Sequence, residues 1–303
     1  MHRPGSCPVR RPCPRRRGRS SGDEQLIRAF VLNVPRSEAE LAADRLSSCG
    51  VVAIEERSAP DDVIELWTSL GEDTAEIASS LTDDLPASWT YRFVEIDEQV
   101  AETWREFARP MTIEPGLVVC PAWIDYQAAS GEVVVRIEPG STFGMGDHPT
   151  TVLSMRALRR AVALRPGPVL DVGCGSGVLA VAACLFGAPS ATAIDISTAS
   201  PQVTKNNAVA NGVGERVEAS CAPLSSIDRR YPVVVANILA PVLIELSADL
   251  VGAVDVGGLL ILSGLLADRY DHVVAAMTGF VVVNVDELDG WVALTMQRAA
   301  STS

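Results

Sequence analysis

The stretch Val169-Leu-Asp-Val-Gly-Cys-Gly-Ser-Gly177 decides the fold of this chain. Two apolar residues lead into an aspartate, glycine then occupies every second position, and an apolar run follows from 178 to 184. A buried strand that enters a glycine-rich turn and then a helix is typical of a nucleotide-binding loop, because glycine lets the backbone turn tightly and approach a ligand. The sequence therefore predicts a strand–loop–helix ligand site here.

The spacing of the glycines indicates which ligand is bound. The dinucleotide fingerprint G-x-G-x-x-G needs a glycine where this chain has Val178, so an NAD-dependent oxidoreductase is disfavoured. Asp-x-Gly-x-Gly-x-Gly instead resembles the first motif of class I S-adenosylmethionine-dependent methyltransferases. We expect S-adenosyl-L-methionine to be the methyl donor, contacted by Asp171, Gly173, Gly175 and Gly177, with a purely structural turn as the alternative.

Composition limits the remaining possibilities. The 303 residues, 48% of them hydrophobic, are enough for two domains with their own cores. No apolar stretch approaches the roughly 20 residues of a membrane span, so no membrane association is expected. Seven scattered cysteines, without a C-x-x-C pair, and only three histidines argue against a metal site and indicate reduced thiols in the cytoplasm.

The first twenty residues contain seven arginines and four prolines but no acidic residue. We expect residues 1–22 to be a disordered tail, either an extension of little function or a basic interaction segment, and they lack the apolar core of a secretory signal. Removing those arginines takes the net charge from −13 to −20. Such an acidic body argues against direct nucleic-acid binding and suits a basic protein substrate.

Patterns of apolar residues divide the rest of the chain. Residues 23–97 predict a small α+β domain, and residues 98–130 a linker in which Pro110, Pro115 and Pro121 punctuate an irregular stretch. Residues 131–303 predict the donor-binding catalytic domain. The elements expected in the first two parts are strands at 26–34, 51–55, 63–67 and 89–96, and helices at 37–49, 74–81 and 101–107.

The expected fold class of the catalytic domain is α/β. Near-continuous apolar strands that alternate with helices indicate a Rossmann-like, mostly parallel seven-stranded sheet, covered on both faces and ending in an antiparallel hairpin. The seven strands expected in this sheet are 169–172, 191–196, 216–219, 233–237, 259–263, 280–285 and 291–297, and a further strand at 131–137 precedes them. The expected helices are 150–164, 178–186, 200–211, 241–250 and 268–277. The ligand would lie beyond the carboxyl ends of the strands.

Two polar residues mark the ends of strands in this domain. Asp195 follows the second strand, where a carboxylate can accept both ribose hydroxyls, or else form a turn or helix cap. Asn237 ends the fourth strand, where its side-chain oxygen can accept hydrogen bonds from an incoming amine and aim the lone pair. A turn asparagine is the alternative at that position.

A second glycine-containing loop, Ser141-Thr-Phe-Gly-Met-Gly-Asp-His-Pro-Thr-Thr151, precedes a helix. Thr150 or Thr151 could cap that helix or contact the carboxylate of the donor. His148 should be extended because proline follows it. We consider it a structural hydrogen-bonding residue, a substrate contact or a proton acceptor.

The segment Phe143-Gly-Met-Gly-Asp-His-Pro-Thr-Thr151 resembles the F-G-T-G-x-H-P-T-T signature of the PrmA family, methyltransferases of a large-subunit ribosomal protein. Residues 171–180 and 235–240 resemble the family's D-x-G-C-G-S-G-I-L-A and V-A-N-I-L-A, and the likeness spans roughly 24–298. The resemblance implies a small domain that grips the ribosomal protein and a catalytic domain that methylates lysine side chains and the N-terminal α-amine. It also implies donor contacts at Thr151, Gly173, Asp195 and Asn237.

The chain departs from the family at some positions. The third strand ends in Ala219-Ser-Cys-Ala222 without an acid, so the adenine amino group needs another partner, and Met145 and Asp147 replace small or hydroxyl residues. A class I enzyme acting on another protein, a small-molecule amine or RNA is an alternative, as is a non-catalytic donor-binding protein. We expect a monomer in the cytoplasm.

Overall fold

The computed structural model describes residues 26–48, 55–69, 82, 85–97, 108–138 and 148–300. Several predictions fall outside these ranges: the tail at 1–22, the helices at 74–81 and 101–107, and residues Met145 and Asp147 of the second loop. No helix in the described ranges is long and apolar enough to cross a membrane.

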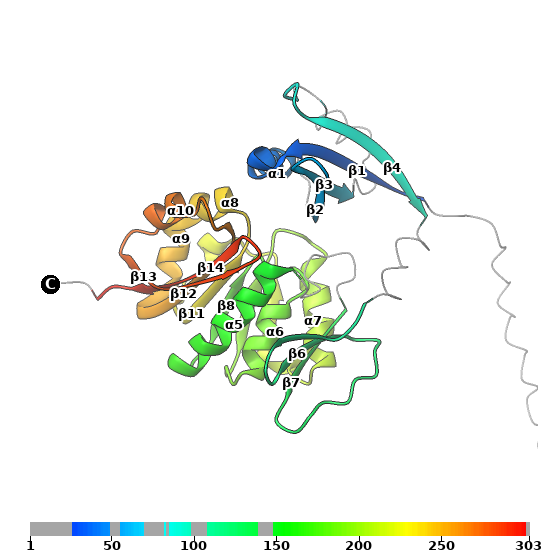
Figure 1. Cartoon of the computed structure of the whole chain (residues 1–303). Helices are drawn as coiled ribbons and strands as arrows, with labels where there is room; N and C mark the ends of the chain where they lie inside the picture. The colour runs from blue at the N-terminus through cyan, green and yellow to red at the C-terminus, as the bar shows by residue number, and fades with distance from the viewer. Residues whose placement is uncertain are drawn as a thin grey trace, which may run out of the picture.

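The N-terminal part contains an antiparallel sheet. Its described strands are β1 (Leu26–Pro35), β2 (Glu55–Ala59), β3 (Val63–Ser69) and β4 (Thr90–Asp97), in the order β2-β3-β1-β4. A short 3-10 turn, η1 (Arg36–Glu38), leads into α1 (Ala39–Ser48). Phe30, Leu32 and Leu66 from the sheet pack with Ala42 and Leu46 from α1, so this part has its own apolar core. Figure 1 shows it in blue and cyan, apart from the larger sheet.

The large sheet confirms the predicted fold class. Within the described ranges, its seven strands are ordered β10-β9-β8-β11-β12-β14-β13; the first five run parallel and β14 is antiparallel to both neighbours. These strands are β8 (Val169–Val172), β9 (Ala191–Ile194), β10 (Val217–Ser220), β11 (Tyr231–Asn237), β12 (Val254–Leu266), β13 (Phe280–Leu288) and β14 (Trp291–Arg298). Asp289 and Gly290, with φ of 51° and 81°, close the hairpin as the two left-handed residues of a type I′ turn.

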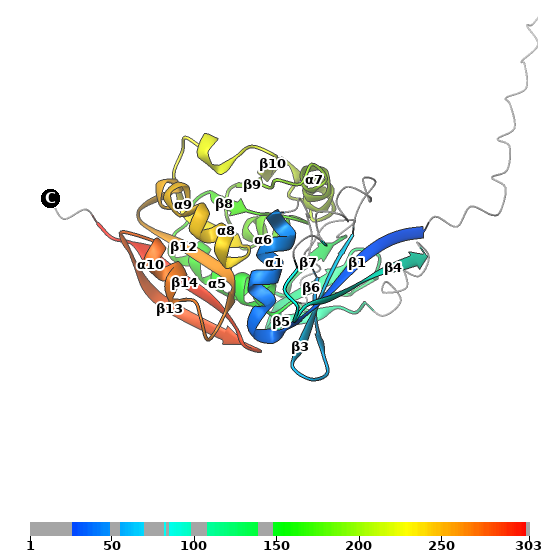
Figure 2. The same ribbon diagram turned by 90° about the horizontal axis from the view of Figure 1, so that it is seen from above.

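Helices cover both faces of this sheet (Figures 1 and 2). One face carries α5 (Pro149–Leu164), α6 (Val178–Leu185) and α7 (Ser200–Ala210), and the other carries α8 (Ala240–Glu245), α9 (Ser247–Ala253) and α10 (Asp271–Ala276), with 3-10 turns η2 (Gly214–Arg216) and η3 (Leu224–Ser226) in the connections. The single helix predicted at 241–250 is wrong. Leu246 (φ −83°, ψ 3°) leaves the helical region, and α9 starts anew from its carbonyl oxygen.

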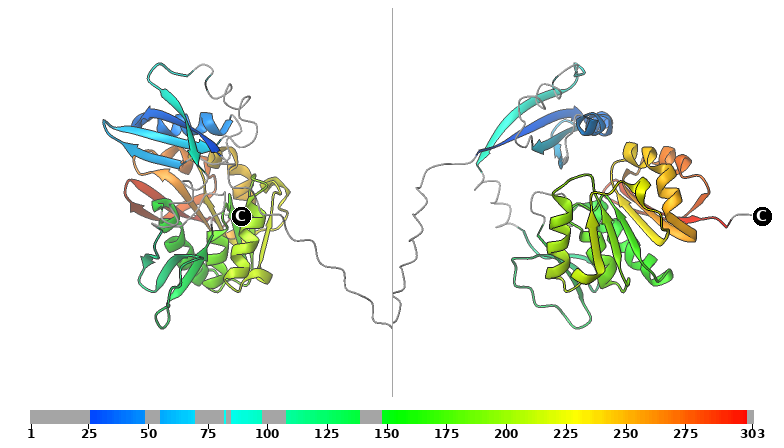
Figure 3. Two further views of the ribbon diagram at one scale, coloured as in Figure 1. Left: turned by 90° about the vertical axis from the view of Figure 1, so that its right-hand side faces the viewer. Right: turned by 180° about the vertical axis from the view of Figure 1, so that it is seen from behind.

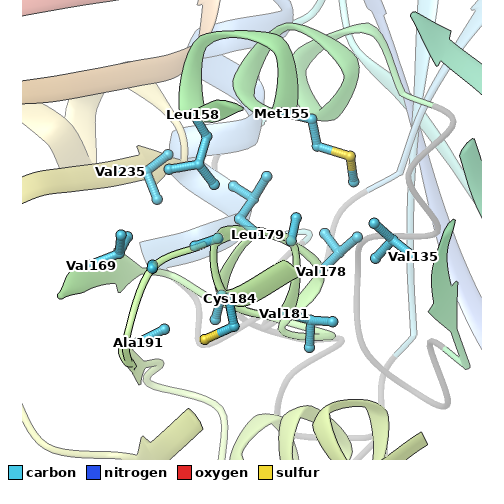
Figure 4. Close-up of a cluster of buried hydrophobic side chains, with 14 of the residues drawn as sticks. Val135, Met155, Leu158, Val169, Val178, Leu179, Val181, Cys184, Ala191 and Val235 are labelled. Atoms are coloured by element: carbon cyan, nitrogen blue, oxygen red, sulfur yellow. The ribbon is translucent and has the colours of Figure 1, made fainter. Parts of the chain in front are cut away.

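Successive residues of each central strand enter opposite layers of the core. Val233 and Val235 pack with α5 and α6, whereas Val234 and Ala236 pack with the layer under α8 to α10. This alternation explains the unbroken apolar runs in the sequence, because both faces of a covered parallel strand are buried. Helix α6 is buried almost throughout; Figure 4 shows Val178 and Leu179 among side chains from α5 and the sheet.

The irregular stretch expected near residues 110–121 is instead a pair of strands. In the described ranges, β6 (Leu117–Pro121) is the central strand of a three-stranded sheet. It pairs with β5 (Met111–Glu114) on one side and with β7 (Val133–Ile137) on the other. The prolines misled the prediction. Pro115 lies in the turn before Gly116 (φ 78°), and Pro121 ends its strand, so neither interrupts a ladder of hydrogen bonds.

Candidate active site

The site forms where the carboxyl ends of three neighbouring strands meet. The glycine loop follows β8, Asp195 follows β9, and Asn237 ends β11. Because β8 lies between β9 and β11, and all three run parallel, their ends lie side by side (Figure 3). The chain leaves β8 toward β9 and only later returns to β11 on the other side, so this edge is the switch point at which open α/β sheets bind ligands.

Glycine is required in this loop for two reasons. Gly173, Gly175 and Gly177 all adopt left-handed backbone conformations, with φ of 74°, 52° and 78°. A Cβ on Gly173 would also lie 2.3 Å from Cγ2 of Ile238, and one on Gly177 would lie 2.5 Å from Cγ2 of Thr204. The loop therefore passes closer to its neighbours than any residue with a side chain could.

Asp171 is buried beneath the loop and caps the following helix. Helix α6 starts after Gly177, which has no side chain to serve as a cap, and Oδ2 of Asp171 accepts from the backbone N–H of Ala180 at 3.0 Å instead. Its Oδ1 has no hydrogen-bond partner among the described residues. Burial raises the pKa of Asp171 to about 7; the bond from Ala180 opposes this shift, and the negative charge of Asp195 adds to it. Asp171 thus fixes the start of α6 after the loop, but removing its carboxyl group from water costs free energy.

Asp195 connects the ends of β8 and β9. Its Oδ2 accepts from the N–H of Gly175 at 2.7 Å, and its Oδ1 accepts from the N–H of Ser197 at 2.8 Å. Asp195 therefore forms the turn that was the alternative to ribose binding. Each carboxylate oxygen has a second lone pair, so the ribose role is compatible with the same geometry. Ile196, next in the chain, is 91% exposed and offers an apolar surface beside the carboxylate.

Asn237 is oriented by a buried threonine of α5. Its Nδ2 donates to Oγ1 of Thr151 at 3.4 Å, and Thr151 is 1% exposed. Because the two ends of an amide point in opposite directions, the acceptor Oδ1 faces away from Thr151. Ser263, the neighbour of Asn237 in the register of β12, is also buried, with its hydroxyl 3.2 Å from the carbonyl oxygen of Thr150. Helix α5 is thus tied to the ends of both strands.

The backbone after Asn237 passes through a narrow gap. Ile238 fills the space that a side chain on Gly173 would need, and its carbonyl oxygen lies 2.4 Å from where a Cβ on Gly264 would be. Gly264 has a φ of 86°. Gly173 on one side and Gly264 on the other therefore make room for Ile238, and this close packing fixes the position of Asn237.

His148 caps helix α5. Its backbone is extended (φ −67°, ψ 138°), as expected before Pro149, and its Nδ1 lies 2.8 Å from Oγ1 of Thr150 and 3.4 Å from the Thr150 backbone nitrogen. Its ring meets that of Trp291 edge to face, with 5.0 Å between centroids. The hydroxyl of Thr150 is thus engaged in the cap. Nδ1 of His148 is thus occupied by the helix cap, which supports a structural role for His148 and argues against Nδ1 as a proton acceptor.

The structure also brings residues to the site that the sequence analysis did not single out. Thr204 and Asn207 of α7 donate to carbonyl oxygens of the glycine loop. The end of β10 contributes Cys221, an exposed thiol 3.5 Å from the carbonyl oxygen of Ser197. The buried residues of α7 are mostly polar (Ser200, Thr204 and Asn207, with Ala208), but the sequence alone does not show which carbonyl groups they bind. No cluster of three or more His, Cys, Asp or Glu side chains suited to a metal occurs in the described ranges.

Comparisons with known proteins agree on one family. The sequence model of the family described as Ribosomal protein L11 methyltransferase (PrmA) matches residues 29–299. The chain is 34% identical to the Ribosomal protein L11 methyltransferase of Desulfotalea psychrophila over 282 residues, 90% of this chain and 93% of that protein. It is 37% identical over 214 residues to the protein of the same name from Shouchella clausii, 69% of this chain and 68% of that one.

A solved structure gives the same result. The crystal structure of ribosomal protein L11 methylase from Lactobacillus delbrueckii subsp. bulgaricus aligns with a TM-score of 0.59 and 32% sequence identity. The alignment covers 63% of this chain and 100% of that chain.

Gly264→Ala tests whether the gap around Ile238 positions the site. The left-handed conformation alone costs an L-residue roughly 1–2 kcal/mol, and the added Cβ would also displace the carbonyl of Ile238. Gly257→Ala is the matched control, since Gly257 is on the same strand with φ of 74° but no described atom lies within 4 Å of its Cβ position. We expect Gly264→Ala to lower the free energy of unfolding more than Gly257→Ala does, because only Gly264→Ala adds a backbone clash to the left-handed strain. Only Gly264→Ala should lower activity, by at least about tenfold. Equal activities would show that the gap does not position Asn237.

Asp171→Asn tests the buried carboxylate. The pKa of Asp171 is higher in the folded chain than the roughly 3.9 of an unfolded aspartate, so the folded state binds more protons between about pH 4 and 7. Without donor, wild type should therefore lose a few kcal/mol of stability as pH rises through that window. Asparagine keeps the acceptor for Ala180 and removes this pH dependence. Denaturant titrations at several pH values would check it, with the exposed Asp228→Asn as control; parallel curves for wild type and Asp171→Asn would contradict the assignment.

Proposed function

Because the chain belongs to the Ribosomal protein L11 methyltransferase (PrmA) family, we propose that it methylates lysine side-chain amines and the N-terminal amine of a large-subunit ribosomal protein, using S-adenosyl-L-methionine. The observation that carries this proposal is the meeting of the glycine loop, Asp195 and the Thr151–Asn237 pair at one edge of the sheet.

The residues at this edge suit the parts of the donor. The glycine loop leaves room for its amino acid end, and Asp195 offers carboxylate oxygens to the ribose hydroxyls. The donor supplies a methyl group on a positively charged sulfur, which is already a good leaving group. The exposed side chain of Ile196 provides an apolar surface for the adenine, and residues 221–227, which directly follow β10, include no acid to bind its amino group.

Asn237 positions the amine that receives the methyl group. Thr151 holds the Nδ2 end of the amide, so the Oδ1 end accepts hydrogen bonds from the incoming nitrogen and directs its lone pair toward the site. Placement of two reacting groups alone can contribute several kcal/mol to a barrier. The nitrogen must be neutral to attack, so its proton is released before transfer.

Charge and thiol state support the choice of substrate and compartment. The chain has a net charge of −13 although its first twenty residues contain seven arginines, so the body attracts a basic ribosomal protein more readily than naked RNA. Cys120, Cys174, Cys184 and Cys221 are free thiols, which suits the reducing cytoplasm. We expect the enzyme to act there as a monomer.

The test is transfer of labelled methyl groups to purified ribosomal protein L11 and to a lysate. We expect label at lysine or at the N-terminus of that protein. Asn237→Ala should slow transfer by roughly 10²–10³-fold, because the amine loses its acceptor, and should weaken donor binding far less. Asn284→Ala, on the exposed strand β13, is the control. Label in a different protein or in RNA would refute the substrate, and an unchanged rate for Asn237→Ala would refute the role of Asn237.

A further inference from the structure

Two buried side chains of α7 hold the glycine loop by its carbonyl groups. Oγ1 of Thr204 donates to the carbonyl oxygen of Gly175 at 3.3 Å, and Nδ2 of Asn207 donates to that of Ser176 at 2.9 Å. The two residues are three apart, so they share one face of the helix. Thr204 is 0% and Asn207 1% exposed. Both side chains are shielded from solvent, and both bind the loop.

Asn207 also binds a second segment of the chain. Its Oδ1 accepts from the N–H of Glu138 at 2.9 Å, and its Nδ2 donates to the carbonyl oxygen of the same residue at 3.0 Å. Glu138 directly follows β7, and the chain continues from it to α5, where Thr151 holds Asn237. One side chain therefore joins the glycine loop to the backbone of the residue after β7.

Asn211, one helical turn after Asn207, binds β7 but not the glycine loop. It makes the same pair of hydrogen bonds to the backbone of Arg136, accepting from its N–H at 2.8 Å and donating to its carbonyl oxygen at 2.6 Å. Among the described residues, its side chain makes no hydrogen bond to the glycine loop. Two asparagines thus connect α7 to the backbone at the end of β7, at Arg136 and Glu138. Of these two asparagines, only Asn207 also binds the glycine loop.

These bonds control the direction of the loop amides. A peptide unit is planar and its C=O and N–H point in opposite directions. Tying the carbonyls of Gly175 and Ser176 to α7 therefore turns the N–H of Ser176 away from the helix, and that of Gly177 toward the carbonyl oxygen of Cys174, to which it donates at 2.7 Å. Release of either carbonyl would let a loop of left-handed glycines, which has little intrinsic stiffness, change its conformation.

We propose that Asn207 is a positioning residue for the methyl donor, which holds the glycine loop in its binding conformation and joins that loop to Glu138, the residue after β7. This inference rests on the proposed function. The residue does not touch the donor; it acts through the carbonyl oxygens of Ser176 and Glu138.

The test compares donor affinity in Asn207→Ala and Asn211→Ala by calorimetric titration with S-adenosyl-L-methionine. Each substitution removes bonds to β7, so both should lower the melting temperature. Only Asn207→Ala should weaken the donor Kd, by about tenfold or more, whereas Asn211→Ala should stay within about threefold of wild type. The KM for the donor should rise likewise, with the KM for the protein substrate unchanged. Partial unfolding would instead lower the number of binding sites and leave Kd unaltered.

If Asn207→Ala does not fold, Thr204→Val carries the test. Valine keeps the packing against Gly177 and removes only the hydroxyl that bonds Gly175, so donor Kd should weaken several-fold. Equal Kd values for wild type and the α7 variants would overturn the inference. A wild-type chain that binds no donor would overturn the proposed function itself, so the two failures are distinguishable.

Discussion

The close passage of Ile238 between Gly173 and Gly264 is the constraint on which the site depends. Both glycines have left-handed backbones, and neither position has room for a Cβ. The residue before this gap is Asn237, which Thr151 orients, and the residue after it is Leu239, which packs against the apolar core of the N-terminal sheet. The three residues 237–239 therefore connect the glycine loop, the side chain of Asn237 and the N-terminal part of the protein.

The burial of the Asp171 carboxyl group is a second feature of the site, and its desolvation lowers stability. Asp171 is wholly buried, caps α6 through Ala180, and keeps one oxygen without a partner among the described residues. A packed core would be more stable without this carboxylate. Asp171 caps α6 in place of Gly177, which has no side chain to do so. Asp195 acts in the same way from β9 by binding the N–H of Gly175.

Much of this arrangement could be predicted from the sequence, and the failures have physical causes. The apolar runs that end at Val172 and Asn237 predicted parallel strands and the edge at which they meet, because covered strands are buried on both faces. Strand β6 was missed because Pro115 and Pro121 suggested irregular structure, although they lie at its ends. Thr204 and Asn207 could not be identified, since their partners are carbonyl groups brought near only by the tertiary fold.

The measurement that tests the account most directly is a crystal structure of the chain with S-adenosylhomocysteine, the product of methyl transfer. The account predicts ribose hydroxyls bound to the carboxylate of Asp195, and the amino acid end beside the glycine loop. It also predicts that the sulfur faces Oδ1 of Asn237. A ligand bound elsewhere, or a ribose turned away from Asp195 with that carboxylate still bound only to Gly175 and Ser197, would contradict it.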